Sequence, residues 1–414
     1  MGKIILEKSS LNGEVSLSGS KTGAMALSIL SILTDDDCIL ENFPINMGDV
    51  SSTISMIESL GKRIDVNGNI VKIKKNLSIK SHLKYSIKQI NFTPLILAAL
   101  LLRKGSCSVP LPGGCKIGNR KIDIYEYIFL KFGATFVQNE NNIHSEIKKK
   151  LVPSKLFLPL ETTGGTICAL ILASGADGES HIINPHLRPE IIEVIHVLNK
   201  MGAEIKIRNG EIHIKGTSVF LGIKQKIMFD IMEAITFVIL SGSTEGEVQI
   251  NNFPYAHLVK PMKTLKYAGL NFDFKNNNLN VFDGGVKAMS ITTGPFPEIQ
   301  SDMQPLFASL AILADGKSKI CDLRFKERYQ YAIELQKLGV KSEFKNGYLQ
   351  INGNKKNMVG ANVIARDIRC GAALIVAGIN ANGKTTIDNI HQINRGYENI
   401  VHKLKILGCK ISNG

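Results

Sequence analysis

The 414-residue sequence has no tryptophan, no Cys-X-X-Cys pair and no long apolar segment. Its seven cysteines are scattered and odd in number, which indicates neither a disulfide framework nor a zinc site. Apolar runs such as 94–102 fall well short of the roughly 20 residues that a membrane-spanning helix needs. The N-terminal residues lack the apolar segment of a signal peptide. We therefore expect a cytoplasmic protein that does not bind a membrane.

The charge of the chain is strongly one-sided, with a formal net charge of +14 at pH 7. Such an excess favours an anionic partner, either nucleic acid, an acidic surface or a phosphorylated metabolite. The basic residues do not gather in one arm and tryptophan is absent, so nucleic acid is the weaker reading. The composition, 44% hydrophobic and 21% charged, is typical of a globular protein, and the length predicts two or three domains.

One pattern occurs six times: an apolar helical segment that ends at a glycine, then a strand, a turn and a second strand. The glycines are Gly61, Gly133, Gly202, Gly269, Gly339 and Gly408. Glycine suits the left-handed residue that ends a helix, and the Asn-Gly or Asn-Asn pairs that follow suit two-residue hairpins. Between these units lie helical segments of small residues, at 164–176, 302–316 and 367–383, which we expect to be buried on all sides. The repeats predict six α+β units, gathered into two domains of three with a cleft between them.

Two glycine-containing loops are candidates for binding an anion. In 17-LSGSKTGAMALSIL-30 a strand leads into a helix, so the helix N-terminus and Lys21 could converge on a phosphate. The alternative is a capped helix with a surface lysine. In 110-PLPGGCKIGNR-120, Lys116 and Arg120 would lower the pKa of the Cys115 thiol and contact an anion. The alternative there is a cysteine packed beneath a glycine turn.

The C-terminal half of the chain carries further candidate charges. Asp302 begins an apolar helix in 296-FPEIQSDMQPLF-307 and is either a reactive carboxylate or a helix cap. Arginines also occur at the edges of apolar elements, where their planar guanidinium groups could bind carboxylate or phosphate or could simply be solvated. They are Arg324, Arg328, Arg366, Arg369 and Arg395.

Together these segments resemble the enolpyruvyl transferases, most closely the branch that acts on UDP-N-acetylglucosamine. The resemblance is carried by the LPGGC loop with its arginine five residues on, F-P-x-x-x-S-D-M-Q, E-R-Y, A-R-D-I-R-C-G-A-A-L and N-R-G-Y-E. It implies an α/β fold of two domains, an inside-out α/β barrel with three βαβαββ units per domain and the active site in the interdomain cleft. One domain would comprise residues 1–20 and 228–414, and the other residues 21–227 with the cysteine loop.

The resemblance also implies a reaction. A sugar hydroxyl attacks C2 of phosphoenolpyruvate while C3 is protonated, and the tetrahedral ketal then loses phosphate. Neither a metal nor an organic cofactor is needed. Cys115 resembles the acid at C3, which fosfomycin alkylates, whereas Asp302 faces the attacking hydroxyl and Asp367 is a second carboxylate. Lys21, Arg120 and Arg395 would hold the phosphate. The other implied substrate-binding residues are Arg328, Arg369, Thr22, Asp123, Thr162 and Gly164.

The chain departs from the family pattern at five positions, which are Thr22, Asn91, Lys121, Ile231 and Asn394. The phosphoenolpyruvate cations and Cys115 are retained, and most departures fall where the acceptor or the hinge would lie. Three readings therefore stay open. The first is enolpyruvyl transfer to UDP-N-acetylglucosamine, the first committed step of peptidoglycan synthesis. The second is transfer to another nucleotide or nucleotide-sugar in secondary metabolism. The third is a non-catalytic sensor of anionic metabolites. For each we expect small-molecule partners and a monomer.

Overall fold

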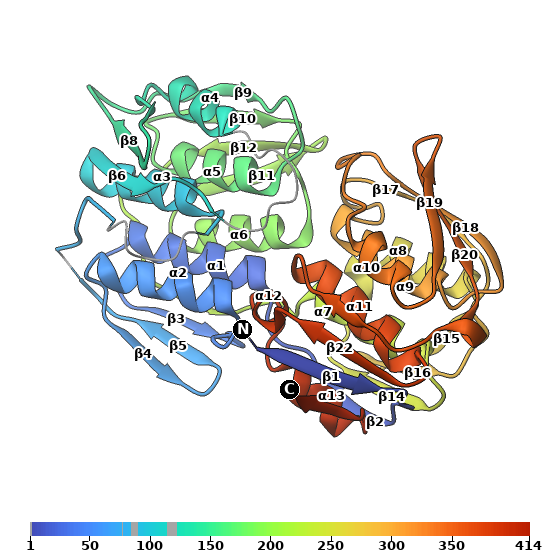
Figure 1. Ribbon diagram of the computed structural model, residues 1–414. Helices are drawn as coiled ribbons and strands as arrows, with labels where there is room; N and C mark the ends of the chain where they lie inside the picture. The colour runs from blue at the N-terminus through green and yellow to red at the C-terminus, as the bar shows by residue number, and fades with distance from the viewer. Residues whose placement is uncertain (1, 77, 84–89, 114–121) are drawn as a thin grey trace.

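The computed structural model describes residues 2–76, 78–83, 90–113 and 122–414. Its buried apolar side chains form two separate cores. The ribbon correspondingly divides into two lobes (Figure 1). One core is drawn from residues 24–227, and we call this part the continuous lobe. The other combines residues 4–17 with residues 231–411, and we call it the discontinuous lobe. The domain boundaries expected after residues 20 and 227 stay a prediction.

The continuous lobe alternates helices and short strands. Its helices are α1 (Lys21–Leu30), η1 (Ser31–Leu33), α2 (Gly48–Ser59), α3 (Thr93–Lys104), α4 (Asp123–Lys131), α5 (Thr163–Ser174) and α6 (Pro189–Lys200). Its strands are β3 (Cys38–Glu41), β4 (Ile64–Asn67), β5 (Ile70–Ile73), β6 (Ser106–Pro110), β7 (Val137–Gln138), β8 (Asn142–Glu146), β9 (Lys155–Phe157), β10 (Glu179–Ile183), β11 (Glu204–Arg208), β12 (Glu211–Lys215) and β13 (Ile223–Lys226).

The discontinuous lobe is built in the same way. Its helices are α7 (Ile231–Gly242), η2 (Tyr255–His257), α8 (Val259–Tyr267), η3 (Ser301–Met303), α9 (Gln304–Ala311), α10 (Tyr331–Gln336), η4 (Lys355–Asn357), α11 (Ile368–Asn380), α12 (Ile390–Asn394) and α13 (Ile400–Ile406). Its strands are β1 (Lys3–Glu7), β2 (Gly13–Ser16), β14 (Glu247–Asn251), β15 (Asn271–Lys275), β16 (Asn278–Phe282), β17 (Ser290–Thr293), β18 (Gly316–Asp322), β19 (Lys341–Lys345), β20 (Tyr348–Gly353), β21 (Asn362–Ile364), β22 (Lys384–Asp388) and β23 (Ile411–Asn413).

The described strands form six open sheets, three in each lobe, and five of them have four strands. These five share one topology, in which a parallel pair is followed by two antiparallel pairs. In one of them β17 runs parallel to β18, β18 antiparallel to β20, and β20 antiparallel to β19. The sixth sheet, β6-β8-β7, has an isolated parallel bridge between His82 and Ser108 at the equivalent edge. The predicted α/β class and six-fold repeat are confirmed, although no closed barrel forms among the described strands.

The predicted turn residues adopt the conformations that their positions require. All six repeat glycines have positive φ, from 80° at Gly133 to 113° at Gly202. Asn209-Gly210, Asn276-Asn277 and Asn346-Gly347 have positive φ at both residues, as a two-residue hairpin of the primed type demands. In the hairpin after α2, β4 ends at Asn67, so the turn begins one residue later, at Gly68.

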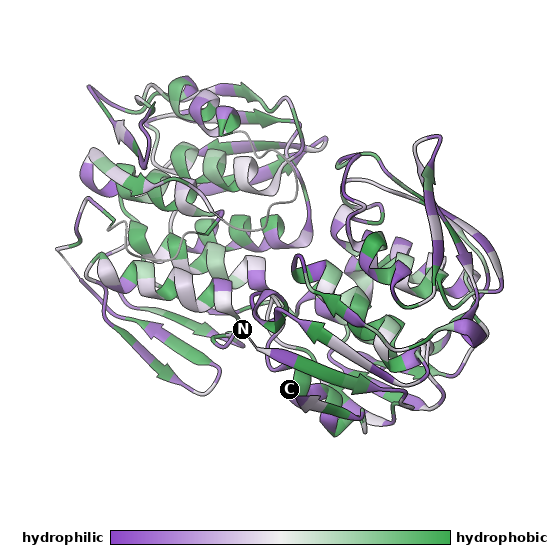
Figure 2. Cartoon of the chain, viewed as in Figure 1, coloured by the Kyte–Doolittle hydropathy of each residue, from purple (hydrophilic) through white to green (hydrophobic). Residues whose placement is uncertain are grey.

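The helices of small residues occupy the centre of each lobe. Every residue of α9 and α11 is buried, as is every residue of α5 after the first. Figure 2 shows apolar residues concentrated on these central helices. Small side chains let the helices approach closely, so each lobe buries a dense core. No helix in the described part of the chain is both long and apolar enough to cross a membrane.

The chain passes between the lobes twice, and the two passages run side by side. Ser20 N donates to Met228 O at 2.7 Å, and Asp230 N donates to Ser18 O at 2.9 Å. Lys21 N donates to Asp230 Oδ2 at 2.9 Å, so the first residue of α1 is tied to the first turn of the other lobe. This double crossover holds Lys21 at the junction of the two lobes.

Candidate active site

A cavity of about 1220 Å³ lies between the lobes. The structure brings most of the predicted site residues to its wall: Lys21, Thr22, Asn91, Asp123, Thr162, Gly164, Asp302, Arg328, Asp367, Arg369 and Arg395. Arg324 and Arg366 line it as well. Cys115, Lys116, Arg120 and Lys121 lie outside the described residues. The predicted clustering of charges in the cleft therefore holds for every candidate that the structure describes.

One buried carboxylate holds two of the predicted phosphate ligands. Asp49, in the first turn of α2, accepts from Lys21 Nζ at 3.1 Å and from Arg395 Nε at 2.8 Å. Its side chain is only 4% exposed. Burial raises the pKa of Asp49, but Lys21 and Arg395 lower it further, so it lies below the ordinary value. Lys21 and Arg395 come from different lobes and are held together by Asp49. The three charged groups together carry a net charge of +1.

A second carboxylate holds the other pair of predicted cations. Asp302 Oδ1 accepts from Arg328 Nη1 at 2.7 Å, and Arg369 Nε lies 3.7 Å from Asp302 Oδ2. Withdrawal from water raises the pKa of Asp302, but the two guanidinium groups hold it well below its usual range. Asp302 lies in η3 and makes no capping hydrogen bond to α9. Of the two readings of this residue, the helix cap is therefore wrong.

Asp367 has a structural task at the start of α11. Its Oδ1 accepts from Arg369 N at 2.7 Å and from Cys370 N at 3.0 Å, which caps the helix. The same oxygen lies 3.8 Å from Arg328 Nη2. The helix N-terminus, the cap and the two arginines consequently face the cavity as one unit. Arg366 is engaged elsewhere, since its Nε and Nη2 donate to Glu334 Oε1 at 2.9 and 2.7 Å.

The guanidinium groups of Arg328 and Arg369 are buried but not fully hydrogen-bonded. Among the described residues, Arg328 Nε, Arg328 Nη2 and Arg369 Nη1 make no hydrogen bond, and the carboxylate nearest to Arg328 Nη2 is Asp367, at 3.8 Å. Arg369 also lies over the ring of Tyr397, 5.3 Å from its centroid. Burial lowers the pKa of Arg369, but Tyr397 and Asp302 raise it, so the group stays charged. Buried charged donors without acceptors are costly. They are suited to the oxygens of an entering phosphate or carboxylate.

The opposite wall of the cavity contains polar residues that sequence reasoning did not single out. Arg188 donates from Nε and Nη2 to both oxygens of Glu190, at 2.7 and 2.6 Å. His186 Nδ1 lies 3.2 Å from Thr163 Oγ1, and its Nε2 accepts from Phe296 N of the other lobe at 3.3 Å. Burial, Arg188 and Arg324 lower the pKa of His186 to about 3, so the ring is neutral. An HLRPE segment carries no familiar motif, which is why these residues were missed.

Three of the predicted substrate-binding residues, Asp123, Thr162 and Gly164, lie at the starts of two helices on this wall. Thr162 is the N-cap residue of α5, and Gly164 lies in its first turn. A Cβ on Gly164 would lie 2.1 Å from Tyr125 Oη, so the backbone and the phenol approach as closely as only glycine allows. Asp123 begins α4 and its Oδ1 accepts from Ile124 N at 2.9 Å. The wall therefore offers backbone and hydroxyl groups more than free charges.

Known proteins share both the sequence and the fold. A family model described as EPSP synthase (3-phosphoshikimate 1-carboxyvinyltransferase) matches residues 5–404. A relative from Elusimicrobium minutum strain Pei191, named UDP-N-acetylglucosamine 1-carboxyvinyltransferase, is 34% identical over 406 residues, covering 97% of this chain and 96% of the relative. A relative of the same name from Buchnera aphidicola subsp. Baizongia pistaciae is 35% identical, with 97% of each chain covered.

Two solved structures show the same fold at lower identity. The enolpyruvyl transferase NikO from Streptomyces tendae has a TM-score of 0.90 at 20% identity, covering 100% of this chain and 99% of its own. EPSP synthase from Acinetobacter baumannii has a TM-score of 0.77 at 16% identity, with 100% of both chains covered. On the family match and the full-length relatives, the chain belongs to the EPSP synthase family and is an enolpyruvyl transferase, an enzyme that acts on small-molecule substrates.

Proposed function

We propose that this enzyme transfers the enolpyruvyl group of phosphoenolpyruvate to the 3-hydroxyl of UDP-N-acetylglucosamine and releases phosphate. The observation that carries the anion half of the proposal is the set of buried, unsatisfied guanidinium donors of Arg328 and Arg369 in the cleft. The acceptor half rests on the shared name of the full-length relatives. The proposal places the enzyme in the cytoplasm, at the first committed step of peptidoglycan synthesis.

The two carboxylate-bridged cation pairs suit the two ends of phosphoenolpyruvate. Lys21 and Arg395, joined by Asp49, would hold the phosphate, with Arg120 as a further ligand that lies outside the described residues. Arg328 and Arg369 would bind the carboxylate end with the donors that lack acceptors. Because the positive groups are in place before substrate arrives, little reorganisation is needed as charge develops.

The reaction proceeds in two steps with every proton accounted for. In the first, the acceptor oxygen bonds to C2 while Asp302 takes the hydroxyl proton and C3 gains a proton from the proposed acid, Cys115, which lies outside the described residues. In the second, C3 returns its proton to the thiolate, the C2=C3 double bond reforms and the C2–O bond to phosphate breaks. The proton on Asp302 leaves with the phosphate. Positioned acid and base groups of this kind contribute about 10²- to 10⁴-fold.

Asp302 is a poor base in the empty cleft, because Arg328 and Arg369 hold its pKa well below its usual range. A bound trianion would attract the same two guanidinium groups and weaken their hold on the carboxylate. The pKa of Asp302 would then rise toward the range in which it can accept a proton. In this proposal phosphoenolpyruvate binds first and activates the base, so the acceptor is deprotonated only when its partner is present.

The second candidate is transfer to another nucleotide or nucleotide-sugar. It is favoured by Thr22 and Asn91, which line the cavity where the family pattern has asparagine and arginine. The fold likeness to NikO, with a TM-score of 0.90, is compatible with it. Of the other departures, Lys121 lies outside the described residues, Ile231 is buried in the core of the discontinuous lobe, and Asn394 ends α12. A cavity of about 1220 Å³ exceeds the roughly 300–1,000 Å³ of common ligand sites and has room for either acceptor beside phosphoenolpyruvate.

Phosphate release from phosphoenolpyruvate tests both candidates. We expect release with UDP-N-acetylglucosamine and none without an acceptor. Release only with another nucleotide or nucleotide-sugar would replace the first candidate by the second.

Mass spectrometry after treatment with fosfomycin tests the cysteine loop separately. We expect one adduct at Cys115, absent in Cys115→Ser and retained in the matched control Cys321→Ser, since Cys321 is a half-buried thiol outside the cleft. An unmodified Cys115 would contradict its assignment as the acid.

A further inference from the structure

Three potential metal ligands lie together on the outer face of the sheet β11-β12-β10-β9, away from the active-site cleft. They are His181 on β10 and Glu211 and His213 on β12, and all three side chains are partly exposed. The alternate residues of the same strands, such as Ile182 and Ile212, are fully buried in the core of the continuous lobe. The three side chains therefore share the solvent face of a sheet whose other face is fixed by packing.

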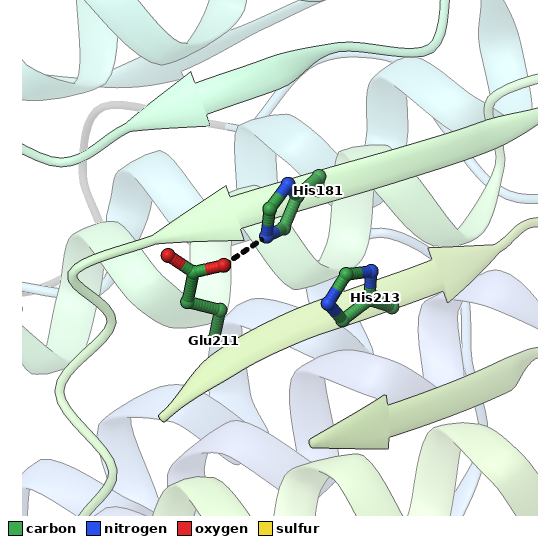
Figure 3. Close-up of side chains that lie close together, drawn as sticks. All are labelled: His181, Glu211 and His213. Atoms are coloured by element: carbon green, nitrogen blue, oxygen red, sulfur yellow. Dashed lines mark hydrogen bonds and ion pairs between the residues drawn. The ribbon is translucent and has the colours of Figure 1, made fainter. Parts of the chain in front are cut away.

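The register of the strands brings the three groups to one point. His181 and His213 are directly paired across the antiparallel strands, and Glu211 lies two residues before His213, on the same face. The two imidazole rings stack with centroids 4.2 Å apart and planes 19° apart. Glu211 Oε2 lies 2.6 Å from His181 Nε2, as Figure 3 shows. One ligand atom from each residue lies within 4.8 Å of the other two.

We propose that His181, Glu211 and His213 form a binding site for a divalent transition-metal ion of the Zn²⁺ type. Two imidazoles and one carboxylate are the ligand set of many zinc sites in which water completes a tetrahedron. Ligand atoms around zinc lie about 3.3 Å apart, as follows from Zn–N distances of roughly 2.0–2.1 Å. In the structure the three ligand atoms lie within 4.8 Å of one another. Small rotations of these partly exposed side chains would bring them to the separation found around zinc, while the strands hold the Cα atoms in place.

An ion pair alone leaves one of the three residues unexplained. His181 and Glu211 satisfy each other as a hydrogen-bonded pair. Within the described ranges no hydrogen bond reaches the His213 ring, which only stacks on its neighbour. A metal ion uses both rings and the carboxylate.

The same face also carries cations that weaken the site. Lys155 is paired with His181 on one side, Lys206 with His213 on the other, and Arg208 with Glu211. These positive groups disfavour a dication by Coulomb repulsion, to an extent that salt reduces. Removal of the Lys206 charge should accordingly tighten metal binding, which is the opposite of what loss of a ligand does.

Calorimetric titration of the full-length, tag-free chain with ZnCl₂ tests the site. We expect one metal per chain, with affinity reduced at least about 10–100-fold in His213→Asn and in Glu211→Gln. Lys206→Ala should bind more tightly, and the matched control His144→Asn, on β8 of a different sheet, should bind as the wild type does. Circular dichroism and thermal unfolding without metal show that each variant is folded.

Cobalt(II) absorption distinguishes this site from the thiols of the chain. We expect the d–d bands of a tetrahedral site with nitrogen and oxygen ligands, and no thiolate charge-transfer band. Unchanged affinity in both His213→Asn and Glu211→Gln, or metal binding that is lost only in Cys115→Ser, would overturn the proposal. Neither result depends on the catalytic assignment, since both are read from binding alone.

Discussion

Glu193 is a buried carboxylate at the double crossover, and its protonation should control the stability of that region. Its Oε1 accepts from Met228 N at 2.8 Å. Its Oε2 has no hydrogen-bond partner in the described part of the chain and lies 2.6 Å from where a Cβ on Gly23 would be. The residue is only 9% exposed. Burial, the largest cause, raises its pKa to about 7.

The direction of the pH effect follows from the pKa values in the two states. The folded state binds the proton more tightly than the unfolded state, whose pKa is near 4.5. The group's contribution to stability is therefore complete below pH 4.5 and is lost as the pH rises through 7. The difference between the folded-state pKa of about 7 and the unfolded-state pKa of 4.5 corresponds to roughly 3 kcal/mol, at about 1.36 kcal/mol for each pKa unit.

Glu193→Gln removes the titration while keeping an oxygen for Met228. We expect the variant to gain stability relative to wild type between pH 5 and pH 8.5, its free energy of unfolding rising by about 2.5 kcal/mol over that of wild type, since pH 5 already lies slightly above the pKa of the unfolded state. Urea unfolding followed by circular dichroism at both values measures it. Comparing two pH values cancels any fixed cost of the buried amide. A difference that does not change with pH would refute the reasoning, and the exposed Glu58→Gln serves as the control.

Three further variants probe the cleft. Asp302→Asn should lower kcat for phosphate release by about 10²- to 10⁴-fold, and an unchanged kcat would remove it as the base. Asp49→Asn leaves two nearly buried cations without their shared counter-ion and should destabilise the fold by about 3–5 kcal/mol, partly restored by inorganic phosphate; equal thermal stability would contradict the bridging role. Gly164→Ala places a Cβ 2.1 Å from Tyr125 Oη and should raise the acceptor KM, whereas Gly285→Ala, whose Cβ meets nothing within 4 Å, should not. An acceptor KM that is the same in Gly164→Ala and Gly285→Ala would place Gly164 outside the acceptor site.

The repeat architecture was predictable because its signals are local. A helix that ends in a left-handed residue needs glycine or asparagine there, and Gly133 and Gly202 are read directly from the sequence. The buried helices were predictable for a similar reason, since small residues on every face leave no surface for solvent. The fold class follows from such short-range constraints, repeated six times.

The ion pairs and hydrogen bonds of the site were not predictable in the same way, because they join residues far apart in the sequence. Asp49 joins Arg395 across 346 positions of sequence, and an aspartate in the first turn of a helix has an ordinary local explanation. Asp302 shows the converse, since its local pattern suggests a cap and only the fold reveals its arginine partners. His186 accepts from Phe296 of the other lobe, a contact that no spacing encodes. Long-range pairing decides which charges are free for substrate.

The position of β1 has a consequence for how the protein is made. β1 lies between β22 and β23 in its sheet, so its two hydrogen-bonding partners are the last strands of the chain. The continuous lobe has all its strands once residue 226 is synthesised. The ribosome adds roughly 5–20 residues per second, so residues 384–388 are synthesised about 20–80 seconds after β1. Throughout that time both edges of β1 lack their native partners, and exposed strand edges of this kind favour pairing with other chains.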